Sequence, residues 1–160
     1  MRAVVQRVER AHVDVVDPAA DPGDEHAGTA EPVVRRVGTL DGPGLVGLVG
    51  VGHDDGPAQV TWLADKLAGL RVLRGERSVL DPPGSGVLLV SQFTLLGDVR
   101  KGRRPTWAAA APGPVAEPLV VALAAALRER GVTVPTGEFG ADMRVHLVGD
   151  GPVTLVLDAP

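Results

Sequence analysis

The residues best placed to do chemistry form a polar tetrad, Ser91-Gln92-Phe93-Thr94, which follows the apolar run 87–90. The Ser91 and Thr94 hydroxyl groups are potential nucleophiles. Thr94 would need an adjacent base, however, and the sequence offers no His or Lys partner at a fixed offset. No Gly-x-Ser-x-Gly sequence surrounds Ser91, so a serine triad has no anchor either. Taken alone, the tetrad is open to a plainer interpretation, in which Phe93 is a core residue and the hydroxyl side chains end a strand.

Four positive charges follow the tetrad within one short loop. They belong to Arg100, Lys101, Arg103 and Arg104. These are a quarter of the 16 positive side chains of a 160-residue chain whose net charge is −4. Such clustering predicts a local anion site, and a solvated loop is the alternative. The spacing of Gly97 and Gly102 resembles a P-loop, but two arginines stand where Lys and Ser or Thr are needed.

The sequence predicts no metal and no cofactor. The chain has no cysteine, so disulfides and thiolate zinc sites are excluded. The histidines are His12, His26, His53 and His146, and none lies three or four residues from another potential ligand on a predicted helix. The glycine-rich stretch 50–56 follows a predicted strand, but its third glycine falls one residue late for a dinucleotide fingerprint. Nucleotide binding there is the weakest alternative, and thermal stabilisation by NAD or ATP would reveal it.

Strands outnumber helices in the predicted order of elements. Alternating or continuous apolar patterns predict strands over 1–16, 33–40, 45–51, 86–96, 143–147 and 153–157, with a turn at 149–152 between the last two. Apolar residues at helical spacing predict two principal helices. The first begins near Pro57 and carries Val60, Leu63, Leu67 and Leu70, and the second carries Leu119, Leu123 and Leu127 and ends before Gly131. The predicted class is α+β, with a mainly antiparallel or mixed sheet, or a barrel-like core, in one domain spanning 1–160.

Two features of composition complete the prediction. Residues 17–32 are rich in Pro, Ala, Gly and acids, and we expect a flexible insertion there. The amino terminus lacks the apolar stretch of a secretory signal, and no run reaches the ~18 apolar residues of a membrane span. We therefore expect a soluble cytoplasmic protein without a membrane partner.

Several ordered motifs together resemble one family, the D-aminoacyl-tRNA deacylases. They are SQFTL at 91–95, RKGRRPTW at 100–107, TGEFGADMRVHLV at 136–148, DGPVT at 150–154 and the opening AVVQRVERAHVDV at 3–15. The resemblance covers nearly the whole chain except 17–32 and a shortened segment near 78–85. It implies a homodimer that hydrolyses the ester between a D-amino acid, or mischarged glycine, and the terminal ribose of tRNA. That activity is proofreading, with tRNA and not DNA as the partner.

The resemblance also assigns roles to residues. Ser91, Gln92, Phe93 and Thr94 would form the catalytic pocket, with backbone N–H groups around Phe93 and Thr94 as oxyanion donors. Gly151 and Pro152, joined by a cis peptide bond, would enter the pocket of the partner subunit. Main-chain carbonyls there could accept hydrogen bonds from the substrate ammonium, so that the Cβ of an L-amino acid meets rigid backbone and is rejected.

The remaining assignments concern the tRNA and the support of the Gly-Pro loop. Phe139 and Met143 would pack around the terminal adenosine and the pocket wall, with ordinary core as their alternative. The four basic residues of 100–104 would contact acceptor-stem phosphates, and Arg7 would support the Gly-Pro loop. Gly149 stands where the family usually has Asn, which leaves the strictness of L-rejection open. A non-catalytic module that binds RNA ends would use the same basic loop and Phe93, and turnover of glycyl-tRNA or D-tyrosyl-tRNA separates the two hypotheses.

Overall fold

The computed structural model describes residues 1–17 and 32–160, and the elements of these residues form one mixed sheet and two long helices. The elements are β1 (Arg2–Asp17), β2 (Val33–Leu40), β3 (Gly44–Gly50), α1 (Pro57–Gly69), β4 (Gly86–Ser91), the 3-10 helix η1 (Phe93–Leu96), α2 (Gly113–Glu129) and β5 (Met143–Asp158). The predicted α+β class is confirmed. The predicted insertion at 17–32 falls mostly outside the described residues.

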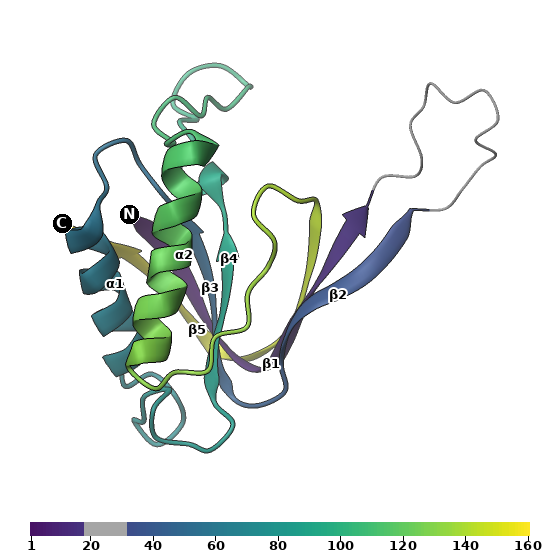
Figure 1. Cartoon of the computed structure of the whole chain (residues 1–160), viewed down its shortest axis with the longest axis vertical. Coiled ribbons are helices and arrows are strands. Elements are labelled where there is room, and N and C mark those ends of the chain that lie inside the picture. The colour runs from purple at the N-terminus through teal and green to yellow at the C-terminus, as the bar shows by residue number, and fades with distance from the viewer. Residues whose placement is uncertain (18–31) are drawn as a thin grey trace.

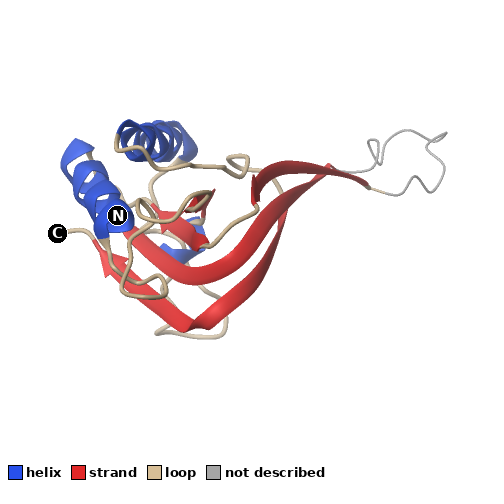
Figure 2. Ribbon diagram, turned by 90° about the horizontal axis from the view of Figure 1, so that it is seen from below, coloured by secondary structure: helices blue, strands red, loops and turns tan. Residues whose placement is uncertain are grey.

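The long strand β1 organises the sheet. Its first half pairs antiparallel with β3, its second half pairs antiparallel with β2, and its other edge pairs with β5 along nearly its whole length. The strand β4 then extends the sheet by parallel pairing with β3. Figure 2 shows the strands curling below the two helices as a half-barrel. The sheet is therefore mixed and open, and the barrel-like prediction holds only in this curled form.

The alternation of side chains along β1 explains which face is buried. Val13 and Val15 are almost fully buried, whereas His12 and Asp14, which alternate with them, remain partly exposed on the opposite face. This is the period of two that a half-buried strand requires. Val13 joins Val8, Leu88 and Val90 in a core cluster under the curl of the sheet.

A second core cluster lies between the sheet and the helices. The helices α1 and α2 lie side by side against the same face of the sheet (Figure 1). Their facing leucines, Leu63, Leu67, Leu123 and Leu127, are fully buried and pack with Val5 and Leu45 from the strands, among others. Burying each such side chain contributes roughly 1.5–3 kcal/mol. Over residues 1–17 and 32–160, no helix has the length and apolar character that a membrane span requires.

Two predicted boundaries were wrong. The predicted strand 86–96 ends at Ser91. The Gln92 N–H still bonds the Val49 carbonyl of β3 at 2.7 Å, and the chain then turns into η1 instead of continuing the strand. The predicted turn at 149–152 does not reverse the chain. Residues on both sides of it belong to β5 and run antiparallel to β1, and the register with β1 shifts between Gln6 and Arg10.

Candidate active site

The tetrad lies where the parallel strand pair ends. Ser91 is the last residue of β4, and η1 begins at Phe93. The first N–H groups of a helix have no acceptor within that helix, so those of Phe93 and Thr94 are left without a partner from η1. The tetrad thus presents backbone donors at the carboxyl end of a buried strand.

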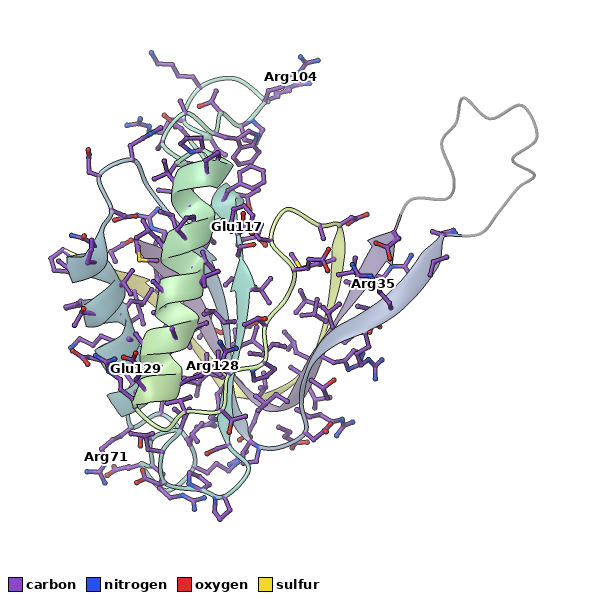
Figure 3. All side chains as sticks on the ribbon, in the orientation of Figure 1. Arg35, Arg71, Arg104, Glu117, Arg128 and Glu129 are labelled. Carbon is purple, nitrogen blue, oxygen red and sulfur yellow. The ribbon has the colours of Figure 1, made fainter. Side chains whose placement is uncertain are left out.

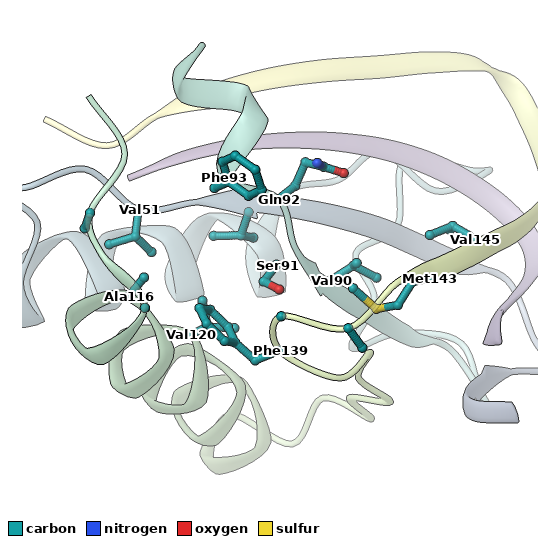
Figure 4. A pocket seen from close by; sticks show the side chains of 15 residues that line it. Val51, Val90, Ser91, Gln92, Phe93, Ala116, Val120, Phe139, Met143 and Val145 are labelled. Atoms are coloured by element: carbon teal, nitrogen blue, oxygen red, sulfur yellow. The ribbon is translucent and has the colours of Figure 1, made fainter. Parts of the chain in front are cut away.

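A pocket of about 360 Å³ opens beside the tetrad (Figure 4). Its lining is mostly apolar and comes from β3, β4, α2 and the segment that leads into β5. The lining residues are Val49, Val51, Val90, Ser91, Gln92, Phe93, Ala111, Gly113, Ala116, Val120, Phe139, Gly140, Ala141, Met143 and Val145. An apolar cavity with a few convergent polar groups is typical of a small-molecule site. Thr94 is not among the lining residues, so three of the four tetrad residues meet the pocket.

Hydrogen bonding within the tetrad orders its amide. The Gln92 Nε2 donates to Thr94 Oγ1 at 2.6 Å. The Thr94 hydroxyl therefore has an amide as its neighbour, and no base contacts it among the described residues. This arrangement orients the Gln92 side chain but does not activate Thr94 as a nucleophile.

Phe93 is an exposed aromatic and not a core residue. It is 55% exposed and meets Trp107 edge to face, with ring centroids 5.4 Å apart. Trp107 also covers the backbone of Gly97, where an added Cβ would lie 2.6 Å from the indole. The plainer interpretation of Phe93 as core is therefore wrong, and the aromatic pair joins the pocket to the basic loop.

Phe139 and Met143 both reach the pocket. Phe139 packs against the cluster under the helices, and Met143 packs against the cluster under the curl of the sheet. Figure 4 shows them on the side of the pocket across from Phe93. Both are half-buried, so each is core on one side and pocket wall on the other.

The basic loop is closed by a pair of backbone hydrogen bonds between Asp98 and Thr106. Arg100 is partly neutralised within the loop, because its Nε and Nη2 donate to the two Asp98 oxygens at 2.9 and 2.6 Å. These bonds hold the pKa of Asp98 below its ordinary value. Lys101, Arg103 and Arg104 are exposed and make no ion pair with any described residue. Figure 3 shows Arg104 at the opposite end of the molecule from Arg71.

The Gly151-Pro152 pair lies on the surface at the irregular middle of β5, and its peptide bond is cis. It borders a separate shallow pocket and does not line the tetrad pocket of its own chain. An added Cβ at Gly151 would lie 2.2 Å from the Val153 nitrogen, so the backbone there requires glycine.

Two arginines hold the residue before this glycine. The Arg7 Nε donates to the Asp150 carbonyl at 2.5 Å, and its Nη1 donates to the Val72 carbonyl at 2.9 Å. The Arg74 Nε donates to the buried Asp150 carboxylate at 2.9 Å. Sequence reasoning singled out Arg7 but missed Arg74 and Asp150. An arginine 76 positions from its partner leaves no local signal in the chain.

The structure also brings together three side chains that looked scattered along the sequence. His12, Asp14 and His146 lie within 4.8 Å of one another through their ligating atoms. Residues 12 and 14 share a strand face, and His146 stands directly opposite His12 in the β1–β5 register. Helical spacing could not reveal this cluster, because the histidines meet across strands.

The fold and the pocket define an α+β half-barrel protein with a ligand site beside its parallel strand pair. The model of one family, D-Tyr-tRNA(Tyr) deacylase, matches residues 4–158. A protein from Kineococcus radiotolerans named D-aminoacyl-tRNA deacylase is 60% identical over 159 residues, which cover 99% of this chain and 100% of the relative. One of the same name from Beutenbergia cavernae is 58% identical with the same coverage.

Two solved structures have the same fold. The c-Myc DNA Unwinding Element Binding Protein is 32% identical with a TM-score of 0.80, over 100% of this chain and 99% of its own. A structure titled as a probable eukaryotic D-amino acid tRNA deacylase has a TM-score of 0.69 at 17% identity, over 98% and 97% of the chains, and supports the fold alone. The chain belongs to the D-Tyr-tRNA(Tyr) deacylase family. The protein is thus an enzyme, a hydrolase that acts on ester bonds.

Proposed function

We propose that the protein hydrolyses the ester that joins a D-amino acid, or glycine, to the terminal ribose of tRNA. The observation that carries this proposal is the pocket beside Ser91, Gln92 and Phe93, in a chain 60% identical to a protein named D-aminoacyl-tRNA deacylase. A pocket of about 360 Å³ suits an aminoacylated ribose rather than a whole nucleic acid. A tRNA substrate places the enzyme in the cytoplasm, where it acts in proofreading.

The chemistry is direct hydrolysis by water. Water adds to the ester carbonyl, the bond between the acyl carbon and the ribose oxygen breaks, and the leaving oxygen takes up a proton. The developing oxyanion needs fixed donors, and the N–H groups of Phe93 and Thr94 with the Gln92 amide supply them. The 2′-hydroxyl of the substrate ribose assists, which makes a protein nucleophile unnecessary.

Selection against L-amino acids is assigned to Gly151 and Pro152 of a second copy of the chain. These residues do not line the pocket of their own chain, and they lie on the surface where a partner can reach them. Their carbonyls bind the substrate ammonium, and the rigid backbone excludes an L side chain while it leaves a D side chain or glycine unobstructed. Arg7 and Arg74 hold Asp150 and so position this loop without the asparagine that Gly149 replaces.

Exposed apolar side chains beside the pocket support the dimer. Val145 and Leu147 of β5 are 37% and 39% exposed, on the strand face that continues the core. Phe93 adds an exposed aromatic at the pocket mouth. Apolar groups gathered around a site are typical of an interaction surface. A partner copy that covers them would bring its Gly-Pro loop to the pocket.

The basic loop is assigned to the acceptor-stem phosphates, with Lys101, Arg103 and Arg104 as the main contacts. Arg100 contributes less, because Asp98 already neutralises it. Phe139 and Met143 hold the terminal adenosine and the inner wall of the pocket. Phosphate contacts position the tRNA without reading its sequence, so specificity for the acyl group comes from the pocket.

The proposal is tested by turnover of D-tyrosyl-tRNA with purified protein. Ala141 lines the pocket, and Ala141→Trp fills it with an indole. We expect this variant to lose nearly all deacylation while it still binds tRNA through the basic loop. Ala125→Trp, on the exposed face of α2, is the matched control and should remain active. If the wild-type protein binds tRNA but does not hydrolyse the ester, it is instead a non-catalytic module that binds RNA ends.

A further inference from the structure

A second potential site lies on the face of the sheet that points away from the core. It consists of His12 and Asp14 of β1 and His146 of β5, none of which lines the tetrad pocket. The neighbours of these residues on β1, Val13 and Val15, point to the opposite side and are buried. The three side chains therefore form a small polar surface cluster, separate from the deacylase site.

The distances from the Asp14 carboxylate to the two histidines are close to those around a transition-metal ion, and all three ligating atoms lie within 4.8 Å of one another. The Asp14 Oδ2 lies 3.4 Å from the His146 Nε2 and 3.7 Å from the His12 Nε2. Bonds of about 2.0–2.1 Å in a tetrahedral zinc site place neighbouring ligand atoms about 3.3 Å apart. The two imidazole rings stack at 16° with centroids 4.4 Å apart, so binding requires each ring to turn slightly towards the carboxylate.

Arg36 of β2 contacts two members of the cluster, His12 and Asp14. Its Nη2 donates to the His12 Nε2 at 2.9 Å, and because an arginine has no acceptor, that nitrogen carries a lone pair. The Arg36 Nε donates to the Asp14 Oδ1 at 2.9 Å, and the Arg36 Nη2 also donates to the Asp14 Oδ2 at the longer distance of 3.5 Å.

The same contacts leave room for an ion. Arg36 binds Asp14 mainly through Oδ1, so Oδ2 remains directed at the two histidines. The Arg36 side chain is 55% exposed, and its Nη2 can leave for water with the loss of two surface contacts, one to His12 and one long contact to the Asp14 Oδ2. The Nε bond to Oδ1 would then remain as the outer hydrogen bond that orients a ligating carboxylate.

We propose that His12, Asp14 and His146 bind a first-row transition-metal ion, with zinc as the preferred physiological occupant and water in the fourth position. Two imidazoles and one carboxylate suit Zn²⁺, Ni²⁺ and Cu²⁺, whereas Mg²⁺ and Ca²⁺ prefer sites made of oxygen. The ion connects β1 to β5, next to the contacts that Arg36 of β2 makes with β1. It joins these two strands and takes no part in ester hydrolysis.

The test is a titration of the full-length, chelator-treated protein with zinc chloride. We expect one high-affinity Zn²⁺ per chain, no response to Mg²⁺, and a rise in Tm with zinc, because the ion binds only the folded arrangement. In NMR spectra, the imidazole signals of His12 and His146 should shift with zinc, and those of His53 should not. If zinc shifted the imidazole signals of other histidines only, the proposal would be overturned. This measurement uses the wild-type protein, so it does not depend on whether a variant folds.

The variants His12→Gln and His146→Gln remove one ligand each. Each should weaken zinc binding at least about tenfold, since losing even an outer-shell partner of a metal ligand costs that much. His53→Gln is the matched control, because His53 is exposed and its Nε2 lies 2.9 Å from the Ala108 carbonyl oxygen, outside the cluster. Unchanged affinity and stoichiometry in both cluster variants would overturn the proposal. Deacylation by His146→Gln should match the wild-type rate.

Discussion

Thr94 is the residue that separates the two mechanisms for ester hydrolysis. Its hydroxyl accepts a hydrogen bond from Gln92, and it does not line the pocket. We therefore expect Thr94→Ala to keep deacylation within about tenfold of the wild-type rate, since one neutral hydrogen bond contributes only about 0.5–1.5 kcal/mol. The measurement is single-turnover hydrolysis of D-tyrosyl-tRNA. Complete loss of activity, with folding and tRNA binding intact, would instead make Thr94 the nucleophile.

Arg7 is the residue on which the Gly-Pro loop most depends. Its guanidinium is mostly buried and donates to the carbonyls of Asp150 and Val72. Arg7→Ala should lower the free energy of unfolding by about 1.5–3 kcal/mol, the range for hydrogen bonds that involve a charged group. It should also increase hydrolysis of L-tyrosyl-tRNA relative to the D form, because the loop loses its support.

The control for Arg7 is Arg10→Ala, an exposed arginine on the same strand. Denaturant unfolding and the ratio of D to L turnover should stay close to wild type in that variant. If Arg7→Ala behaves like the control in both measurements, the loop is held by other contacts and the positioning role of Arg7 is refuted.

At the scale of elements, the sequence predicted the strands and helices whose apolar pattern can be read from neighbouring residues. The alternation of β1 and the leucine spacing of both helices follow from one strand face and one helix stripe being buried, and the structure confirms them. The end of the chain was predicted as two strands joined by a turn, because Gly149-Asp150-Gly151-Pro152 has the composition of a turn. In the structure, β5 pairs with β1 on both sides of these residues, and this pairing with a distant strand outweighs their local preference for a turn.

The candidate site was predictable only in part for the same reason. The apolar run 87–90 predicted the strand that leads into Ser91 and Gln92, but the predicted strand 86–96 extended past its true end at Ser91. Phe139 and Met143 lie 45 or more positions after the tetrad, so only the resemblance to a family placed them in the same pocket. Arg74, Asp150 and the histidine cluster depend on contacts between strands and loops that no local pattern encodes.

The loop that follows η1 carries the prediction about tRNA binding. Arg103 and Arg104 are exposed and unpaired within the described chain. The double variant Arg103→Ala/Arg104→Ala should weaken tRNA binding and flatten the slope of log K against log salt by about 1.4–1.8, or 0.7–0.9 for each lost phosphate contact. Equilibrium binding at several salt concentrations measures both effects.

Arg71→Ala is the control for charge alone, because Arg71 lies at the opposite end of the molecule (Figure 3). It removes one positive charge and should leave the slope unchanged. A double variant whose slope equals that of the wild type would show that the loop does not contact phosphates.

At the scale of the whole molecule, the proposal requires two chains for each working site. The pocket variant Ala141→Trp keeps an intact Gly-Pro loop, and Gly151→Leu keeps an intact pocket but adds a side chain to the loop. Each should be inactive alone. Co-expressed chains pair at random in a two-fold dimer, so half the dimers hold one native site and about a quarter of wild-type activity should return. A mixture with no recovered activity would mean that each site uses its own loop.

Handedness of the substrate is the central claim, and one measurement tests it most directly. The same tRNA is charged with D-tyrosine and with L-tyrosine, and hydrolysis by the purified enzyme is followed for both under identical conditions. We predict rapid release of the D-amino acid, while the L-ester decays no faster than it does without enzyme. Equal rates for the two esters, or release of the L-amino acid alone, would contradict selection by the backbone of Gly151 and Pro152.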